Sequence, residues 1–256
     1  MFLPIRDDNP AVRTPYVTIG IIVVNVLAYL LTGLFVNSTQ AHLYSLKLGL
    51  IPYELTHFTE ISGLIAQETV RGYFDTGNLS VPILLTPFTS MFMHGGFMHI
   101  ASNMLFLWIY GNNIEDYFGH VRFLIFYLVG GLAAAGLHIL FSSNSPVPMI
   151  GASGAIAAVL GAYYVLYPRA KVQIIYFFFF IGTTWLPARW VLGFFFAVQV
   201  FYALTTAGNQ GGGVAYLAHL GGFIFGWLLL RAIVAKRGGP QNFDGGDRAQ
   251  VYRVKF

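Results

Sequence analysis

Apolar stretches long enough to cross a lipid bilayer alternate with short polar turns along most of the chain. A membrane-spanning helix needs about 20 mostly apolar residues, and six stretches close to that length contain no Asp, Glu, Lys or Arg. These stretches span residues 17–35, 97–112, 123–141, 150–167, 190–207 and 214–230. The pattern predicts an all-α, multi-pass membrane protein with six transmembrane helices.

A seventh apolar run, residues 172–187, does not fit this pattern. It is short, it consists largely of β-branched and aromatic residues, and it ends near Gly182 and Pro187. These features disfavour a helix that crosses the whole bilayer. We therefore predict an interfacial or re-entrant segment here and keep a seventh span as the alternative.

The positions of the basic residues test this count, because cytoplasmic loops of membrane proteins are enriched in Lys and Arg. With six helices and the N-terminus inside, all of the 14 Lys and Arg residues except Lys47 and Arg71 fall on the inner side. The short outer loops 142–149 and 208–213 then carry no charge. A seventh span would move Arg189 or the basic residues after the last helix to the outer side. The charge pattern thus favours six helices with both termini cytoplasmic.

These predictions divide the chain into three parts. Residues 1–15 form a cytoplasmic N-terminal segment, residues 16–236 the membrane domain, and residues 237–256 a flexible cytoplasmic tail. Within the membrane domain, the outer loop between the first two helices, residues 36–96, is much longer than the other loops. Its apolar residues recur at near-helical spacing, which predicts short helices lying in the membrane interface. A loop of this length is often functional.

The composition agrees with a membrane protein and narrows the chemistry. The chain has 256 residues, of which 56% are hydrophobic and 9% charged, whereas soluble domains carry roughly 25% charged residues. A freestanding soluble enzyme is therefore excluded, and membrane topology rather than nucleic-acid binding explains the net charge of +4. The chain has no cysteine, which excludes disulfides, thiolate zinc sites and a cysteine nucleophile.

Four polar side chains lie near the outer ends of three predicted helices. His99 and Asn103 are four residues apart on one face of the second helix, while Ser153 and His219 lie near the starts of the fourth and sixth. All three helices enter the membrane from the outer side, so these groups reach one level, roughly 6–12 Å deep at 1.5 Å per residue. Polar groups there are costly unless they are partnered or functional. We expect them to share one aqueous cavity open to the outer side.

Stripes of small residues indicate which of these helices touch. Helices approach closely in lipid where Gly, Ala and Ser line the contact. The stripe on the fourth helix is Ser153, Ala157 and Gly161, and that on the sixth is Ala215, His219, Gly222 and Gly226. Packing of the two stripes would bring Ser153 within hydrogen-bond reach of His219.

A serine beside a histidine is the minimum pair for acyl transfer by nucleophilic catalysis. All 10 Asp and Glu residues lie outside the predicted spans, so no carboxylate is available to complete a triad at this depth. We predict a dyad of Ser153 as nucleophile and His219 as general base, with the imidazole oriented by packing, water or a neutral partner. The candidate oxyanion donors are His99, Asn103 and the backbone N–H of Ser153.

Three motifs, in order on the second, fourth and sixth helices, resemble those of the rhomboid intramembrane serine proteases. They are His94-x4-His99-x3-Asn103, Gly151-Ala152-Ser153-Gly154 and Ala218-His219-x2-Gly222-x3-Gly226. The resemblance covers roughly residues 16–235 and extends to the acidic pair Glu115-Asp116 at the end of the second helix. It implies a prokaryotic-type, six-helix rhomboid-like bundle and the same roles for Ser153, His219, His99 and Asn103. We expect structural or packing roles near the site for His94, Gly151, Gly154, Gly222 and Gly226.

The resemblance also implies what the protein acts on. Its substrates would be single-pass or polytopic membrane proteins, cleaved in or near their transmembrane segments within the lipid bilayer. No cofactor or metal and no nucleic-acid partner are expected, and the oligomeric state stays open. The implied location is a prokaryotic plasma membrane, with the active site open to the outer side.

Two positions depart from the family pattern. Leu85-Thr86 stand where members often have Trp-Arg in the outer loop, and Ala157 stands where many have an aromatic residue that stacks on the catalytic histidine. The side chains that hold His219 must therefore come from elsewhere in the bundle.

Three other interpretations compete with the protease. A non-catalytic relative that binds and escorts transmembrane helices usually lacks the serine or the base, and both are present here. A metal site built from the histidines, His138 included, lacks a His-Glu-x-x-His motif and leaves Ser153 unexplained. A transporter or channel would be expected to show an internal repeat or a buried charge pair, and the sequence shows neither.

Overall fold

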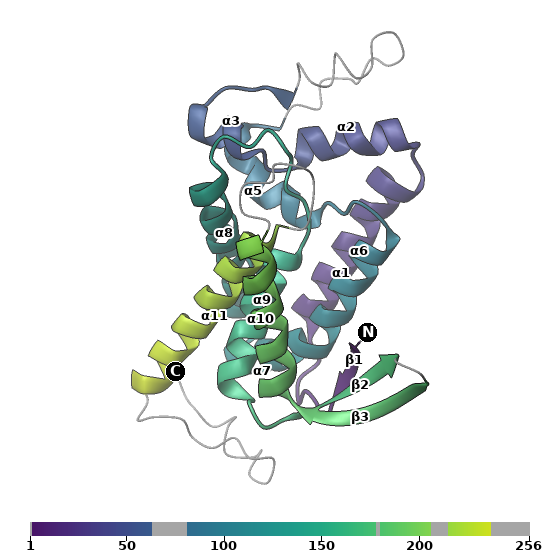
Figure 1. Ribbon diagram of the computed structural model, residues 1–256, viewed down its shortest axis with the longest axis vertical. Coiled ribbons are helices and arrows are strands. Elements are labelled where there is room, and N and C mark those ends of the chain that lie inside the picture. Colours follow the sequence, from purple (N-terminus) through teal and green to yellow (C-terminus); the bar gives the residue numbers. More distant parts are fainter. Residues whose placement is uncertain (1, 63–80, 178–179, 206–214, 237–256) are drawn as a thin grey trace.

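Helices standing side by side make up most of the structure, a computed structural model that describes residues 2–62, 81–177, 180–205 and 215–236 (Figure 1). The predicted outer loop 208–213, part of the long loop and the predicted flexible tail 237–256 lie outside these residues. The helices of the bundle are α1 (Tyr16–Tyr29) continued by η1 (Leu30–Leu34), α6 (Phe97–Phe106), η4 (Leu107–Gly111), α7 (Asn112–Phe118), α8 (His120–Ser142), α9 (Ser153–Leu166), α10 (Ala188–Thr205) and α11 (Tyr216–Lys236).

Each of the six predicted spans is helical over most of its length. Within the described ranges, four helices are long and apolar enough to cross a membrane: Tyr16–Leu34, His120–Ser142, Ala188–Thr205 and Tyr216–Lys236. The second predicted span is interrupted by the π-helical turn η4, and the fourth, α9, has 14 residues. The chain is thus a mostly helical polytopic membrane protein, while six crossings remain a prediction.

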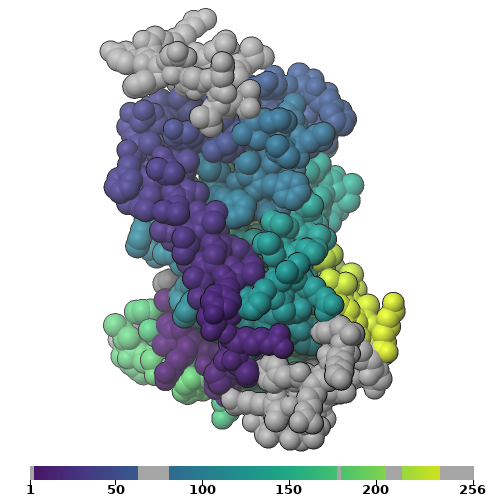
Figure 2. Space-filling view, turned by 180° about the vertical axis from the view of Figure 1, so that it is seen from behind, coloured from purple at the N-terminus to yellow at the C-terminus, as the bar shows by residue number. Residues whose placement is uncertain are grey.

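The outer faces of these helices are apolar and exposed, as lipid contact requires. On the first helix Leu27 and Leu31 are 53% and 69% exposed, and on α8 Ile125 and Leu140 are 56% and 72% exposed. Figure 2 shows α1 running beside α8 on the rear face of the molecule. Contiguous apolar surface on this scale is unusual in a soluble monomer, so these faces are suited to lipid.

Helical structure continues past the predicted end of the second span at residue 112, through α7. Two carboxylates of α7, Glu115 and Asp116, are buried there, and each accepts hydrogen bonds from backbone N–H groups. Glu115 accepts hydrogen bonds from the N–H groups of Val17 and Thr18, at 2.9 and 2.7 Å, and Asp116 accepts one from Val12 at 2.5 Å. The first N–H groups of a helix lack intrahelical partners and carry a partial positive charge. Glu115 therefore caps the N-terminus of α1, and Asp116 binds the backbone of the segment just before it, so α7 is joined to the start of the first helix.

A small antiparallel sheet corrects the all-α prediction. Strands β1 (Phe2–Asp7), β2 (Lys171–Phe177) and β3 (Ile181–Pro187) pair in that order. The described residues of 172–187 thus form two paired strands at one end of the bundle (Figure 1). The re-entrant segment and the seventh span are therefore wrong, while an interfacial position stays a prediction. The β-branched and aromatic residues of this segment favour a strand. Its strand β2 pairs with β1, which lies more than 160 residues earlier in the chain, and no local sequence pattern reveals such a pairing.

The sheet is fastened to the centre of the bundle through one carboxyl group. Asp7, the last residue of β1, accepts hydrogen bonds from the Tyr163 hydroxyl of α9 at 2.5 Å and from the Asn113 amide of α7 at 3.0 Å. Burial raises the pKa of Asp7 from its usual value to about 6. Within the predicted N-terminal segment 1–15, β1 is therefore attached to the helix bundle.

Short helices occupy the described part of the long loop, at the end of the bundle opposite the sheet (Figure 1). They are α2 (Ser38–Leu48), α3 (Pro52–His57), η2 (Ile83–Leu85), α5 (Thr86–Thr89) and η3 (Ser90–Phe92). The two positions that depart from the family pattern, Leu85 and Thr86, lie where η2 passes into α5. A pair of backbone hydrogen bonds between Leu50 and Met149, 3.0 and 2.7 Å, ties this loop to the α8–α9 connection.

Backbone-to-backbone contact between α9 and α11 confirms the packing predicted from the small residues. A methyl group added at Gly222 would lie 2.1 Å from the carbonyl oxygen of Gly154, and one at Gly226 would lie 2.0 Å from that of Ala158. On the other side, a methyl at Gly161 would lie 2.1 Å from the carbonyl oxygen of Phe223. Only glycine permits such an approach at these positions.

Gly222→Ala should therefore destabilise the bundle. The added methyl cannot be accommodated by rotating a side chain, because the atom it meets belongs to the α9 backbone, and we expect a loss of about 1–3 kcal/mol or more in the free energy of unfolding. Thermal or denaturant unfolding in detergent micelles measures the change. The matched control is Gly136→Ala in α8, where no atom lies within 4 Å of the added methyl. Equal stability of the two variants would contradict this packing argument.

Candidate active site

Ser153 is the first residue of the most deeply buried helix. With 14 residues, α9 is about 21 Å long at 1.5 Å per residue, shorter than the ~30 Å hydrocarbon core. It stands at the centre of the bundle (Figure 1), so its N-terminus does not reach the end of the surrounding helices. The helix was predicted to begin at residue 150; its later start leaves Ser153 at the edge of a cavity.

The turn before Ser153 depends on glycine. Gly151 has φ +125°, a conformation that side-chain-bearing residues rarely adopt, and its N–H donates to the Ser90 carbonyl at 2.8 Å. A methyl group at Gly151 would lie 2.7 Å from Nε2 of His99 and 3.6 Å from Oγ of Ser153. The chain therefore passes between these two side chains at a place where only a glycine fits.

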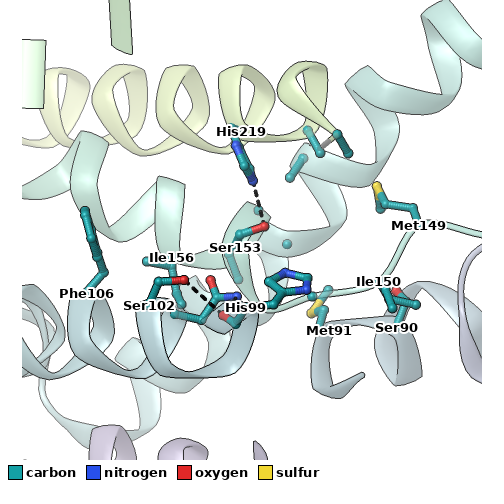
Figure 3. Close-up of a pocket in the computed structure, with 18 of the residues that line it drawn as sticks. Ser90, Met91, His99, Ser102, Phe106, Met149, Ile150, Ser153, Ile156 and His219 are labelled. Carbon is teal, nitrogen blue, oxygen red and sulfur yellow. Dashed lines mark hydrogen bonds between the residues drawn. The ribbon is translucent and has the colours of Figure 1, made fainter. Parts of the chain in front are cut away.

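His219 of α11 lies directly against Ser153. Its Nε2 is 2.7 Å from the Ser153 Oγ, and Figure 3 shows the ring directed at that hydroxyl. The close contact of α9 with α11 at Gly154 and Gly222 makes this distance possible, as the stripes of small residues predicted. A hydroxyl hydrogen-bonded to an imidazole nitrogen has the geometry of a nucleophile and its general base.

Gln199 of α10 contacts the other nitrogen of the same ring. Its Oε1 lies 2.7 Å from Nδ1 of His219, and the residue is 7% exposed. Sequence reasoning missed Gln199. The available signal was a glutamine inside an otherwise apolar stretch of a predicted membrane helix, a costly placement that calls for a partner.

Phe195, one turn before Gln199 on α10, stands near the ring as well. The centroids of Phe195 and His219 are 6.4 Å apart with the ring planes tilted by 34°. At the position where many family members carry a stacking aromatic, Ala157 is fully buried. The neighbours that hold His219 therefore come from α10, two residues at the i, i+4 spacing that places both on one helix face.

His99 and Asn103 lie on the opposite wall of the site. The Asn103 amide donates to the His99 carbonyl at 2.9 Å, and an amide nitrogen has a second N–H available for donation. The Gly95 N–H donates to His99 Nδ1 at 3.4 Å, which favours the tautomer with hydrogen on Nε2. That nitrogen faces Gly151, so a polar N–H is directed toward the side of the cavity that holds Ser153.

His94 supports His99 rather than entering the site. It is 4% exposed, and its ring meets that of His99 edge-on at 5.0 Å between centroids. Burial, together with the neighbouring His99, lowers the pKa of His94 to about 4, so it is uncharged at neutral pH. This position beside His99 favours the structural role predicted for His94, which stays a prediction.

A cavity of about 680 Å³ connects these groups. Its polar wall residues include His99, Asn103, Ser153 and His219, and its lining is otherwise mostly apolar. His138 is absent from the lining described for this cavity. A volume of this size, with few polar groups converging in an apolar wall, is typical of a binding site.

The sequence matches a family model and several known proteins. A family model described as "Rhomboid domain" matches residues 84–236. The chain is 35% identical over 158 residues to Rhomboid protease GluP of Bacillus subtilis, covering 61% of this chain and 27% of that protein. It is 28% identical over 156 residues to Rhomboid protein 1, mitochondrial, of Saccharomyces cerevisiae, covering 58% of this chain and 42% of that protein.

A human protein is matched to a similar extent. The chain is 31% identical over 165 residues to Presenilin-associated rhomboid-like protein, mitochondrial, of Homo sapiens, covering 62% of this chain and 41% of that protein. The matches thus cover less than half the length of each of these relatives.

Proposed function

The chain belongs to the rhomboid family, and on that premise we propose that it is an intramembrane serine endopeptidase that works through a Ser153–His219 dyad. The observation that carries the proposal is the 2.7 Å contact between Ser153 Oγ and His219 Nε2, at the edge of a cavity within the helix bundle. The contact joins α9 to α11, so the pair is held by the packing of two helices rather than by one local segment.

The proposed reaction begins with attack of Ser153 Oγ on the scissile carbonyl carbon while Nε2 of His219 takes the hydroxyl proton. The resulting oxyanion is stabilised by N–H donors aimed at it, for which we propose His99 Nε2, the Asn103 amide and the backbone N–H of Ser153. His219 then gives its proton to the leaving amine. Water hydrolyses the acyl-enzyme with His219 again as base, which regenerates the serine.

The proposed substrates are membrane proteins cleaved in or near a transmembrane segment, without a cofactor. A helical substrate must unwind locally, because its scissile peptide bond is otherwise hydrogen-bonded and screened by side chains. The mostly apolar cavity suits a short unwound stretch of such a segment.

The proposed orientation places the sheet and both termini on the cytoplasmic side and the cavity mouth on the outer side. The strong bias of basic residues supports this assignment. The prokaryotic plasma membrane stays a prediction, since the matched relatives include mitochondrial proteins as well as a bacterial one.

Labelling with a fluorophosphonate tests the proposal against a protein that only binds helices. Wild-type protein in detergent or liposomes should be labelled, because an activated serine Oγ attacks the phosphorus and expels fluoride. Ser153→Ala should not be labelled. Ser102→Ala, which removes a different hydroxyl from the same cavity, should retain the label. A folded wild-type protein that resists labelling would favour the non-catalytic escort of transmembrane helices instead.

A further inference from the structure

We propose that Gln199 is the third, neutral member of the catalytic arrangement: a positioning residue whose amide oxygen holds His219 in the tautomer that can accept the Ser153 proton. This inference rests on the proposed function and adds a residue to it. It stands on the contacts of His219 with two different helices, α9 and α10.

The tautomer matters because a neutral imidazole carries hydrogen on only one of its two nitrogens. To accept the proton of Ser153, Nε2 must present a lone pair, so the hydrogen must lie on Nδ1. A hydrogen on Nδ1 needs an acceptor, and Oε1 of Gln199 lies 2.7 Å away. If the Gln199 amide were rotated to present its NH₂ group, it would donate to Nδ1 and move the hydrogen to Nε2, where the ring could no longer act as base.

Gln199 lies on the buried face of α10. The buried residues Leu192, Gln199 and Ala203 follow one face of α10, the face that packs inward. The side chain therefore cannot be explained as a polar residue reaching toward water. The Phe195 ring, also on α10, stands near the imidazole with 6.4 Å between the ring centroids, so α10 supplies both an aromatic neighbour and a hydrogen-bond partner for His219.

A neutral partner also fits the surroundings better than an acid. Among the described residues that line the cavity there is no Asp, Glu, Lys or Arg, and His99 is the one titratable side chain besides His219. A carboxylate there would be a buried charge with no cation to pair with while His219 is neutral. An amide oxygen supplies the same hydrogen-bond acceptor without that cost, although it stabilises the imidazolium of the transition state less than a carboxylate would.

The test compares two substitutions of Gln199 in the full-length protein. Gln199→Leu keeps the approximate size and removes the acceptor, so kcat for a transmembrane reporter should fall about 10- to 100-fold per folded protein while KM changes little. Gln199→Glu keeps an acceptor oxygen, so most of the activity should return. Its carboxylate would also stabilise the imidazolium, and the acid limb of the pH–rate profile should therefore move to higher pH.

The matched control is Asn25→Leu, which removes a buried amide from α1 that donates to its own helix at Ile21. This variant can lose stability, but its kcat per folded protein and its pH profile should match the wild type. A merely structural Gln199 would behave in the same way, with activity following the amount of folded protein and with no rescue or pH shift in Gln199→Glu.

The outcomes separate this inference from the function on which it rests. If the wild type is neither active nor labelled by fluorophosphonate, the proposed protease function fails. If the wild type is labelled and Gln199→Leu is labelled and cleaves at the same rate, only the role of Gln199 is overturned. If Gln199→Leu is slowed and Gln199→Glu is equally slow with an unshifted pH profile, the tautomer argument is overturned as well.

Discussion

Purified Ser153→Ala protein should lose cleavage of a transmembrane reporter, with kcat/KM falling on the order of 10³-fold or more relative to the wild type. The variant lacks the oxygen that we propose as the nucleophile, and no other hydroxyl in the described structure is hydrogen-bonded to His219. The residual rate would come only from substrate binding and the oxyanion donors, which act without a nucleophile.

The measurement needs evidence that the variant folds. Removing one hydroxyl at the first residue of α9 leaves the glycine contacts with α11 intact, so thermal unfolding of Ser153→Ala should resemble that of the wild type. Ser142→Ala, at the last residue of α8 and not among the residues that line the cavity, is the matched control and should cleave normally. Cleavage by folded Ser153→Ala at the wild-type rate would refute the mechanism.

His219→Ala should cause a loss of the same order, for a different reason. Ser153 would remain, but nothing would take its proton during attack or protonate the leaving amine afterwards. In the proposed mechanism the serine and histidine act as a unit, so the double variant Ser153→Ala/His219→Ala should be no less active than either single variant. Initial rates with a purified reporter, compared at equal amounts of folded protein, measure all three.

His138→Ala is the control for His219→Ala. His138 is also a membrane-helix histidine, on α8, and its Nδ1 is buried without a hydrogen-bond partner in the described structure. It is not one of the cavity-lining residues, so its replacement should leave the cleavage rate per folded protein unchanged. Equal losses in the two variants would mean that the assay reports folding rather than catalysis.

The contrast between Ser153 and Gln199 shows which parts of the site a sequence can reveal. Ser153 and His219 are each embedded in glycine and alanine at helical spacing, so their motifs predict both helix contact and chemistry. Gln199 has no such surroundings; its neighbours Val198 and Val200 are ordinary membrane-helix residues. Its role depends on how α10 is rotated about its axis, and rotation is decided by packing against other helices rather than by the segment itself.

The carboxylates of α7 show the same limit in the fold. Their charge made residues 113–118 look like the polar turn after a membrane helix, and the sequence resemblance identified the pair without a physical role. In the structure Glu115 accepts backbone N–H groups at the start of α1, and Asp116 accepts those of Val12 and Arg13 just before it, so both carboxylates have partners where they are buried. A charge can lie inside a helix bundle when a helix terminus compensates it, and that partner is almost a hundred residues distant in the chain.

The sequence by itself determined the membrane class, the helical segments, the contact of α9 with α11 and the candidate pair Ser153 and His219. These properties depend on local composition and on 3.6-residue periodicity, which a single segment contains in full. Only the tertiary structure decided that β2 pairs with the N-terminal strand β1, that α9 begins at Ser153, and that Gln199 faces the imidazole. Each of these features depends on hydrogen bonds and packing between segments far apart in the chain. Such interactions contribute to stability only when the bundle has formed, so no single segment encodes them.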